Sequence, residues 1–190
     1  MTSEERREIR YQRRKAKRDE ARLKRSMACG DFDEVFSFRH LYLSAKKCCK
    51  GVYWKSSTQR YISNLIPNIS ETLLSLRNGT FIHRGFHEFY IMERGKKRHI
   101  RSVHISERTV QKCLCDYCIV PIYSASFIYD NSASLKHRGM DFALRRMVYH
   151  LERHFRKHGL AGGILIYDFK SFFDDAPHEP LLAEAERRLH

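Results

Sequence analysis

Residues 163–175 read Gly-Ile-Leu-Ile-Tyr-Asp-Phe-Lys-Ser-Phe-Phe-Asp-Asp. The four consecutive apolar or aromatic residues before Asp168 predict a buried β-strand that ends at this carboxylate. Burying an unpaired carboxylate costs several kcal/mol unless a cation or hydrogen-bond donors meet it. Asp168 is therefore the residue whose presence most needs an explanation, and a metal ion is the first candidate to lie against it.

The chain has 190 residues and is strongly basic, with 36 Lys and Arg against 22 Asp and Glu and a net charge of +14. A hydrophobic content of 42% is typical of a folded protein rather than a disordered one. A charge of this size indicates a polyanionic partner, and nucleic acid is a commoner one than a membrane. A basic soluble protein without such a partner is the alternative that composition leaves open.

The sequence contains no apolar stretch near the roughly 18 residues that a membrane span needs. The amino terminus is charged from Glu4 onward and holds no apolar segment typical of a secretory signal. The six Cys then predict free thiols in a reducing compartment. We therefore expect a cytoplasmic protein with no membrane partner, while its oligomeric state stays open.

The charge pattern sets off residues 1–28 as a basic helical arm. Residues 1–25 hold eleven basic and five acidic side chains and no Gly or Pro. Acidic residues come first and basic residues come last, an order that suits the helix macrodipole. A solvated helix that tracks phosphates is one interpretation, and a charged tail with no specific role is the other.

Residues 29–162 are expected to form a mainly helical region, and residues 163–190 to begin a further one. Apolar spacing, turn residues and prolines predict helices over 69–77, from Ser106 to before Pro121, over 138–158 and after Pro177 and Pro180. They also predict a hairpin with strands 86–92 and 98–104 around a basic turn at 93–97. One face of the 138–158 helix is expected to be buried.

The block from Ile164 to Leu182 resembles the first catalytic motif of bacterial reverse transcriptases. In that family an apolar strand ends in a metal-binding Asp, followed by a Lys or similar residue, paired aromatics and a Pro-His-x-x-Leu-Leu helix start. The residues that fit this motif position by position are Asp168, Lys170, Phe172, Phe173, Pro177, His178, Leu181 and Leu182.

Two upstream blocks extend the resemblance over residues 90–182. Residues 95–101 and 107–111 are similar to the basic fingers hairpin and helix of group II intron and retron-like enzymes, a group to which diversity-generating retroelement enzymes also belong. Residues 131–144 are similar to the next fingers segment. The resemblance implies an α+β fold, with helix-rich fingers, a β-hairpin and the first strand of a right-hand polymerase palm, truncated after that strand.

The resemblance also implies a site for nucleotidyl transfer with two Mg²⁺ ions. Asp168 would bind both ions, and the backbone carbonyl of Phe169 would add a ligand. Phe173 matches the aromatic steric gate that rejects a 2′-hydroxyl on the incoming sugar, although a core aromatic is the alternative. Asp174 and Asp175 are expected to cap the next helix rather than to bind metal.

The basic hairpin is where the family grips the triphosphate of the dNTP. Lys96, Arg98 and Arg101 are the expected nucleotide-binding residues, and Arg98 best matches the bidentate guanidinium clamp. Lys97 belongs to the same turn and is expected to contact nucleic acid, but a solvated basic turn is the alternative for the whole hairpin. Arg108 and Gln111, one helical turn apart, are expected to contact either the template backbone or the hairpin.

Residues 113–118 read Cys-Leu-Cys-Asp-Tyr-Cys and invite a zinc interpretation. On a helix Cys115 and Cys118 share a face, but Cys113 points away, and no second pair follows at zinc-finger spacing. Buried free thiols are the favoured interpretation.

The sequence differs from the family in one respect, which is that it holds no Tyr-x-Asp-Asp motif. We therefore expect an amino-terminal fragment of an RNA-directed DNA polymerase that is inactive alone. The intact enzyme would add dNTPs to a primer 3′ end on an RNA template. Two alternatives stay open: a catalytically inactive RNA-binding derivative, and a defence-related polymerase that extends DNA without a template.

Overall fold

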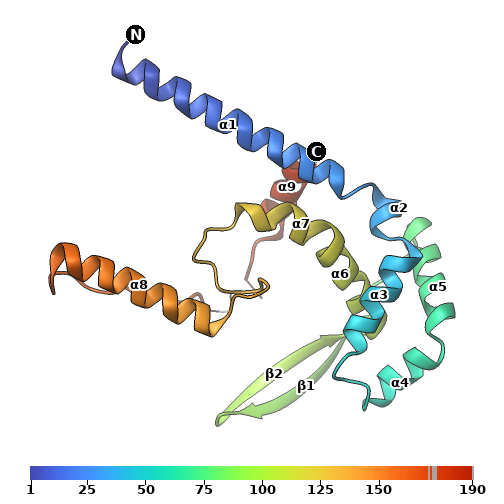
Figure 1. Ribbon diagram of the computed structural model, residues 1–190. Coiled ribbons are helices and arrows are strands. Elements are labelled where there is room, and N and C mark those ends of the chain that lie inside the picture. The colour runs from blue at the N-terminus through green and yellow to red at the C-terminus, as the bar shows by residue number, and fades with distance from the viewer. Residues whose placement is uncertain (171, 173–174, 190) are drawn as a thin grey trace. The chain divides into compact units, whose positions relative to one another are not determined.

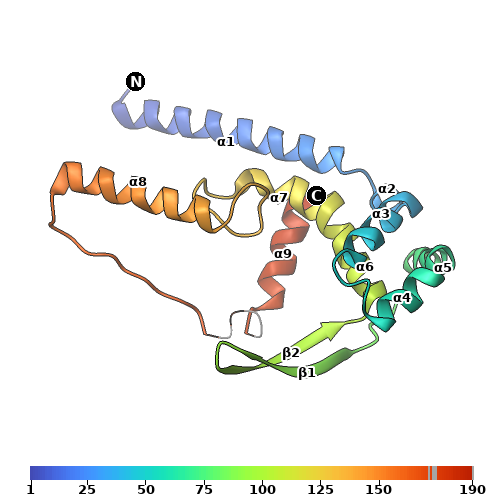
Figure 2. The ribbon, with the colours of Figure 1, turned by 60° about the horizontal axis from the view of Figure 1, so that its bottom comes forward.

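The computed structural model describes residues 1–170, 172 and 175–189, and it divides the chain into two units, Met1–Ile122 and Tyr123–His190 (Figures 1 and 2). Its elements are α1 (Ser3–Ala28), α2 (Phe32–Val35), α3 (Phe38–Cys49), α4 (Ser56–Ser63), α5 (Leu65–Arg77), β1 (Phe86–Glu93), β2 (Lys96–Val103), α6 (Ile105–Leu114), a π-helical turn (Cys115–Ile119), α7 (Val120–Tyr123), a 3₁₀ turn (Ser124–Ser126), α8 (Met140–His158) and α9 (His178–Leu189). The described residues thus form a helix-rich structure with one two-stranded antiparallel sheet, which confirms the α+β class.

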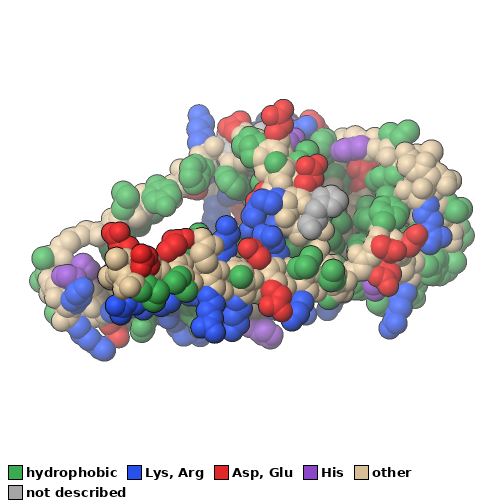
Figure 3. Space-filling view, turned by 90° about the horizontal axis from the view of Figure 1, so that it is seen from above, with side chains coloured by type: hydrophobic (Ala, Val, Ile, Leu, Met, Phe, Trp, Pro, Cys, Tyr) green, Lys and Arg blue, Asp and Glu red, His purple; other side chains and the backbone are tan. Residues whose placement is uncertain are grey.

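The arm at the start of the chain is the long helix α1, as the charge pattern predicted. Its first turn is fixed by a capping box, in which the Glu5 N–H donates to the Thr2 hydroxyl at 3.2 Å and the Thr2 N–H donates to the Glu5 carboxylate at 2.7 Å. No residue of α1 is buried. In Figure 3, Lys and Arg side chains gather along one edge of α1, while acidic side chains near its N-terminus lie on the other edge.

The core of the first unit lies where α3, α5 and α6 pack against one another. Leu41 of α3, Ile69 of α5 and Cys113 of α6 are each 0% exposed. Burying an apolar side chain of this size stabilises the folded state by about 1.5–3 kcal/mol. This three-helix core carries the base of the hairpin, which Figures 1 and 2 show projecting away from the helices of the unit.

Three prolines that were expected to lie outside helices lie within them: Pro67, Pro121 and Pro180, of which Pro180 is in the first turn of α9. Pro67 is in the first turn of α5, which begins at Leu65 rather than at residue 69. Pro121 does not stop the helix that follows the hairpin, because the chain widens into the π-helical turn and continues as α7. A proline is tolerated in the first turn of a helix, where its missing N–H has no intrahelical partner to lose. The π-helical turn begins a new hydrogen-bond register just before Pro121.

The second unit consists of α8 and α9 with the loops that precede them. The Arg146 guanidinium and the His150 ring, both on α8, bind the Asp130 carboxylate, and they hold its pKa below the usual range. Gly159, at φ 62°, ends α8 where the sequence predicted. These contacts fix the loop before α8 to one side of that helix.

The apolar face of α8 is exposed, contrary to the prediction that one face of this helix is buried. Met147, Val148, Leu151 and Phe155 are all exposed, and no residue of α8 or α9 is buried. The 3.6-residue spacing produced the helix and gathered its apolar side chains on one side. Burial also requires a second layer, and the described residues of the unit provide none that covers this face.

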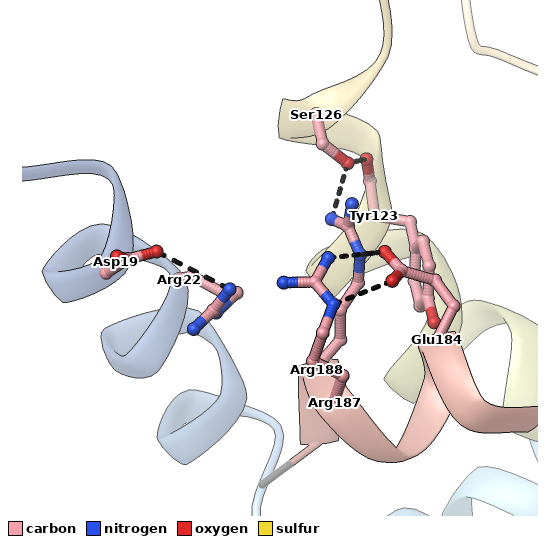
Figure 4. Close-up of polar contacts among 7 residues, drawn as sticks. All are labelled: Asp19, Arg22, Tyr123, Ser126, Glu184, Arg187 and Arg188. Atoms are coloured by element: carbon pink, nitrogen blue, oxygen red, sulfur yellow. Dashed lines mark hydrogen bonds and ion pairs between the residues drawn. The ribbon is translucent and has the colours of Figure 1, made fainter. Parts of the chain in front are cut away.

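Within the second unit, α9 is anchored by its arginines. The Arg188 guanidinium donates to the Ser126 hydroxyl at 2.8 Å and lies 4.9 Å from the centre of the Tyr123 ring (Figure 4). Glu184 accepts hydrogen bonds from Arg187 and Arg188, which lower its pKa to about 2. In the described part of the chain, no helix has the length and apolar character needed to cross a membrane.

Candidate nucleic-acid interface

The hairpin forms as predicted, with a tighter turn. Arg94 and Gly95 are the two turn residues, at φ 49° and 77°, as a type I′ turn requires. Strand β1 pairs with β2 from Phe86↔Val103 to Glu93↔Lys96. Lys96 and Lys97 therefore belong to β2 rather than to the turn, and their side chains alternate between the two faces of the hairpin.

The register divides the four predicted cations between opposite faces. Lys97 and Arg101 lie on one face, and Lys96 and Arg98 lie on the other, because directly paired residues share a face and successive residues alternate. The resemblance had assigned Lys96, Arg98 and Arg101 to the nucleotide and Lys97 to nucleic acid. No single face of the hairpin therefore carries all four cations.

The face with Lys97 and Arg101 combines cations with aromatic rings. We call it the basic–aromatic face, and it consists of Phe86, Glu88, Tyr90, Met92, Lys97, His99, Arg101 and Val103. The Lys97 ammonium lies 4.3 Å from the Tyr90 ring centre, and the Tyr90 and His99 rings stack at 4.8 Å. The Arg101 guanidinium lies 4.5 Å from the Phe86 ring centre. Cations over exposed rings provide both stacking surfaces and phosphate contacts.

One acidic residue moderates the charge of the basic–aromatic face. The Glu88 carboxylate lies 3.2 Å from Arg101 and 3.1 Å from His99. Lys97 forms no ion pair with any described carboxylate, so its positive charge is fully available to a ligand. Tyr90, at 62% exposed, also presents its ring to solvent.

The opposite face of the hairpin also combines apolar residues with cations. It presents Phe89, Ile91 and Ile100, and its Arg98 guanidinium forms an ion pair with Glu93 at 2.8 Å. The residue predicted as the triphosphate clamp therefore has a carboxylate partner in this structure. Its role as a clamp stays a prediction.

The base of the hairpin is held by a buried carboxylate on α6. Glu107 is 4% exposed, and its carboxylate accepts a hydrogen bond from the Arg84 N–H at 2.7 Å and contacts the His83 ring at 3.2 Å. His104 caps α6, and its pKa is lowered by burial and by the nearby Arg84 charge. These contacts tie the entry to β1 and the exit from β2 to the same helix turn. The direction of the hairpin is thereby fixed.

Arg108 and Gln111 both lie exposed on α6. They follow the turn that holds the hairpin, so they are available to a ligand that approaches this part of the first unit. Which of the two predicted partners they contact stays a prediction.

A polar groove of about 650 Å³ lies beside the base of the hairpin. Its charged and amide side chains are Arg60, Asn64, Asn68, Glu71, His83, Arg84 and His104. Its walls come from α4, α5 and the segment before β1, which no local sequence pattern joins. Sequence reasoning missed this groove for that reason. It also missed Phe86 and Tyr90, although their two-residue spacing from Glu88, which puts all three on one face of a strand, was a signal that could have found them.

The predicted strand before Asp168 does not form. Residues 163–169 belong to no strand, and Ile164, Leu165 and Ile166 are 69%, 83% and 87% exposed. A strand needs a partner for its backbone N–H and C=O groups, and β1 and β2 pair only with each other among the described residues. Asp168 is therefore exposed, and no burial energy requires a cation beside it.

The described residues do not fit a two-metal site. No group of three or more His, Cys, Asp or Glu among them is close enough to hold a metal ion. The Phe169 side chain is exposed and contacts the rings of Tyr167 and Phe172, with both pairs of ring centres 6.2 Å apart. Phe173, the expected steric gate, and Asp174 lie outside the described residues.

The cysteines near the end of α6 are free thiols, of which Cys113 and Cys118 are buried, as the sequence favoured, and Cys115 is half-buried. Cys113 is buried, its thiol donates to the Val35 carbonyl at 3.2 Å, and burial raises its pKa to about 11. Cys118 is also buried, and burial raises its pKa as well. A protonated buried thiol packs as a small apolar side chain, so these residues belong to the core.

The sequence matches no model of a known protein family, and no curated protein is significantly similar to it.

Proposed function

We propose that this chain is part of an RNA-directed DNA polymerase of the reverse transcriptase type. In this proposal it supplies the fingers surface that holds an RNA template, a nucleic-acid primer and an incoming dNTP. Three blocks of sequence in the order of that family support the proposal. The structural observation that carries it is the basic–aromatic face of the hairpin.

The chemistry of the basic–aromatic face suits an unpaired nucleic-acid strand. A base can stack on Tyr90 or Phe86, which contributes about 1–3 kcal/mol per base and tolerates any base. Lys97 and Arg101 then lie beside the rings, where they can contact the phosphates that link successive bases. Arg108 and Gln111 on α6 are proposed to contact the same strand.

Asp168 and Phe169 are proposed as metal ligands of a complete catalytic site only. A two-metal polymerase site needs further carboxylates, and the described residues place none beside Asp168. We assign binding to this chain and expect no nucleotidyl transfer from its 190 residues alone.

The binding proposal is tested with an RNA template annealed to a DNA primer that leaves a single-stranded template overhang. We expect the affinity of the chain for this substrate to fall steeply with salt, since each phosphate contact releases counterions. The variant Lys97→Ala/Arg101→Ala should reduce the slope of log affinity against log salt by about two for two lost phosphate contacts.

A matched control is Lys96→Ala/Arg98→Ala, which removes the same charge from the opposite face of the hairpin. We expect a smaller change in slope, because Arg98 is paired with Glu93. A larger effect from the control variant would assign nucleic-acid binding to the opposite face. Binding that is absent or insensitive to salt would contradict the proposed function.

The second candidate is an RNA-binding protein without chemistry, and the absence of a metal-binding cluster among the described residues favours it. A photoreactive dNTP separates the two. A polymerase segment should crosslink through its hairpin in the presence of primer and template, whereas the RNA-binding protein should not. Incorporation of labelled dNTP by the purified chain would contradict both the second candidate and the expected inactivity.

A further inference from the structure

Helix α1 carries a row of cations that the hairpin site does not use. We call it the cationic stripe, and it consists of Arg6, Arg7, Arg10, Arg13, Arg14, Lys17 and Arg18. At 3.6 residues per turn these seven side chains fall within an arc of about 140°. All seven are exposed, and none forms an ion pair with a described carboxylate.

The acidic residues of α1 lie away from the stripe. At the same helical spacing Glu4, Glu5 and Glu8 fall on the opposite side of the helix, in agreement with the two edges that Figure 3 shows. Further along, Asp19 pairs with Arg22 at 3.5 Å (Figure 4), and Arg22 lies outside the stripe. None of the ion pairs within α1 therefore neutralises a charge of the stripe.

The density of charge along the stripe matches that of a nucleic-acid strand. From Arg6 to Arg18 the helix rises about 18 Å at 1.5 Å per residue, which gives roughly one cation per 3 Å. A single strand of duplex DNA presents one phosphate per about 3.4 Å of axis. One edge of the helix is therefore charged at the spacing of one sugar–phosphate strand.

The side chains of α1 favour this partner over a membrane surface or a DNA base edge. A helix that lies in a lipid interface needs a broad face with Trp, Phe or Leu, but α1 has no Trp or Phe, and Ile9, Leu23 and Met27 form only a narrow seam. Reading of adenine uses Asn or Gln, and the stripe contains neither, while its Arg and Lys side chains bind phosphates as well as guanine edges. Its contacts are suited to phosphates of any sequence.

We propose that the cationic stripe binds the phosphate backbone of double-stranded RNA, at a site of its own that is distinct from the proposed single-strand site on the hairpin. The choice of RNA rests on the proposed function. An α-helix about 10–12 Å wide does not fit the deep, narrow major groove of A-form RNA. The stripe therefore lies against the backbone at the surface of the duplex, without entering that groove.

The test uses the full chain and a blunt RNA duplex, which offers no single-stranded overhang to the hairpin. The variant Arg10→Gln/Arg14→Gln removes two charges from the stripe, and Gln keeps a high helix propensity. We expect it to reduce the slope of log affinity against log salt by about two. The control variant Lys15→Gln/Arg22→Gln removes the same charge from outside the stripe and should change the slope little.

Circular dichroism of each variant shows whether α1 stays helical. Equal slopes for the stripe variant and the control would overturn the inference, as would tighter binding of the wild-type chain to a DNA duplex of the same sequence. A loss of binding to anionic phospholipid vesicles, with no change toward RNA, would also overturn it by assigning the stripe to a membrane surface. The hairpin variant Lys97→Ala/Arg101→Ala should keep its affinity for the blunt duplex, so failure of the stripe and failure of the hairpin site are observed separately.

Discussion

The two units of the chain contain similar amphipathic helices but differ in what those helices bury. In Met1–Ile122, α3, α5 and α6 enclose fully buried side chains such as Leu41 and Ile69. In Tyr123–His190 no described residue is buried, although α8 has an apolar face of the same kind. An apolar face on a helix is therefore necessary for a core but is not sufficient, because a second helix must also cover that face.

The same difference distinguishes the hairpin, in the first unit, from the segment that carries Asp168, in the second unit. The hairpin rests on the buried Glu107 and the helices of the first unit, so its geometry is fixed. Asp168 follows an exposed segment of the second unit that has no hydrogen-bonded partner strand among the described residues. The hairpin is therefore held in place by buried contacts, whereas the described residues place neither a partner strand nor a metal-binding cluster beside Asp168.

The largest effect is expected from removing core volume in the first unit. Ile69→Ala should lower the free energy of unfolding by about 2–5 kcal/mol, through lost burial and the cavity that remains. Leu151→Ala removes the same number of carbons from α8, where the side chain is 42% exposed, and should cost less than about 1 kcal/mol. Urea unfolding followed by circular dichroism measures both, and equal losses would contradict the comparison.

The next effect concerns the anchor of the hairpin. Glu107→Ala removes the acceptor of the Arg84 N–H and should cost about 1–3 kcal/mol, with faster hydrogen exchange in β1 and β2. Glu107→Gln keeps an acceptor oxygen and should retain most of the protection. If the hairpin amides exchange equally fast in the wild type and Glu107→Ala, the carboxylate does not hold the hairpin.

A smaller effect is expected at the hairpin turn. Gly95 has φ 77°, and a Cβ added there would meet no atom within 4 Å, so Gly95→Ala should cost about 1 kcal/mol through backbone strain alone. Gly163→Ala, at a position with equal space and no left-handed φ, should cost little. Cross-strand contacts in NMR spectra measure the population of the hairpin, and an unchanged population in Gly95→Ala would mean that the turn does not set the register.

The smallest effect is expected at the surface of α9. The hydrogen bonds from Arg187 and Arg188 lower the pKa of Glu184 from its ordinary 4.5 to about 2. The contribution of this carboxylate to stability is therefore complete above the ordinary pKa and is lost as the pH falls toward 2. An NMR titration of the Glu184 carboxyl should show the low midpoint, and a midpoint near 4.5 would mean that α9 lacks these contacts in solution. Glu184→Gln is the control that removes the titration.

Local patterns predicted most of the elements. The charge order of residues 1–28 predicted α1, and the turn residues around Arg94 and Gly95 predicted the hairpin, because both depend on contacts between residues close in sequence. The division of Lys96, Lys97, Arg98 and Arg101 between two faces was missed, since it depends on a one-residue register. The groove beside the hairpin was missed because its walls come from separate segments.

By itself the sequence determined the basic character of the chain, its helices and hairpin, and the resemblance on which the polymerase proposal rests. Only the tertiary structure decided which apolar faces are buried, which cations share a surface, and that Asp168 is exposed after a segment that is not a strand. The physical reason is the range of the interactions. Helical periodicity, caps and tight turns act over a few residues, whereas strand pairing, burial and a metal site need partners from distant parts of the chain.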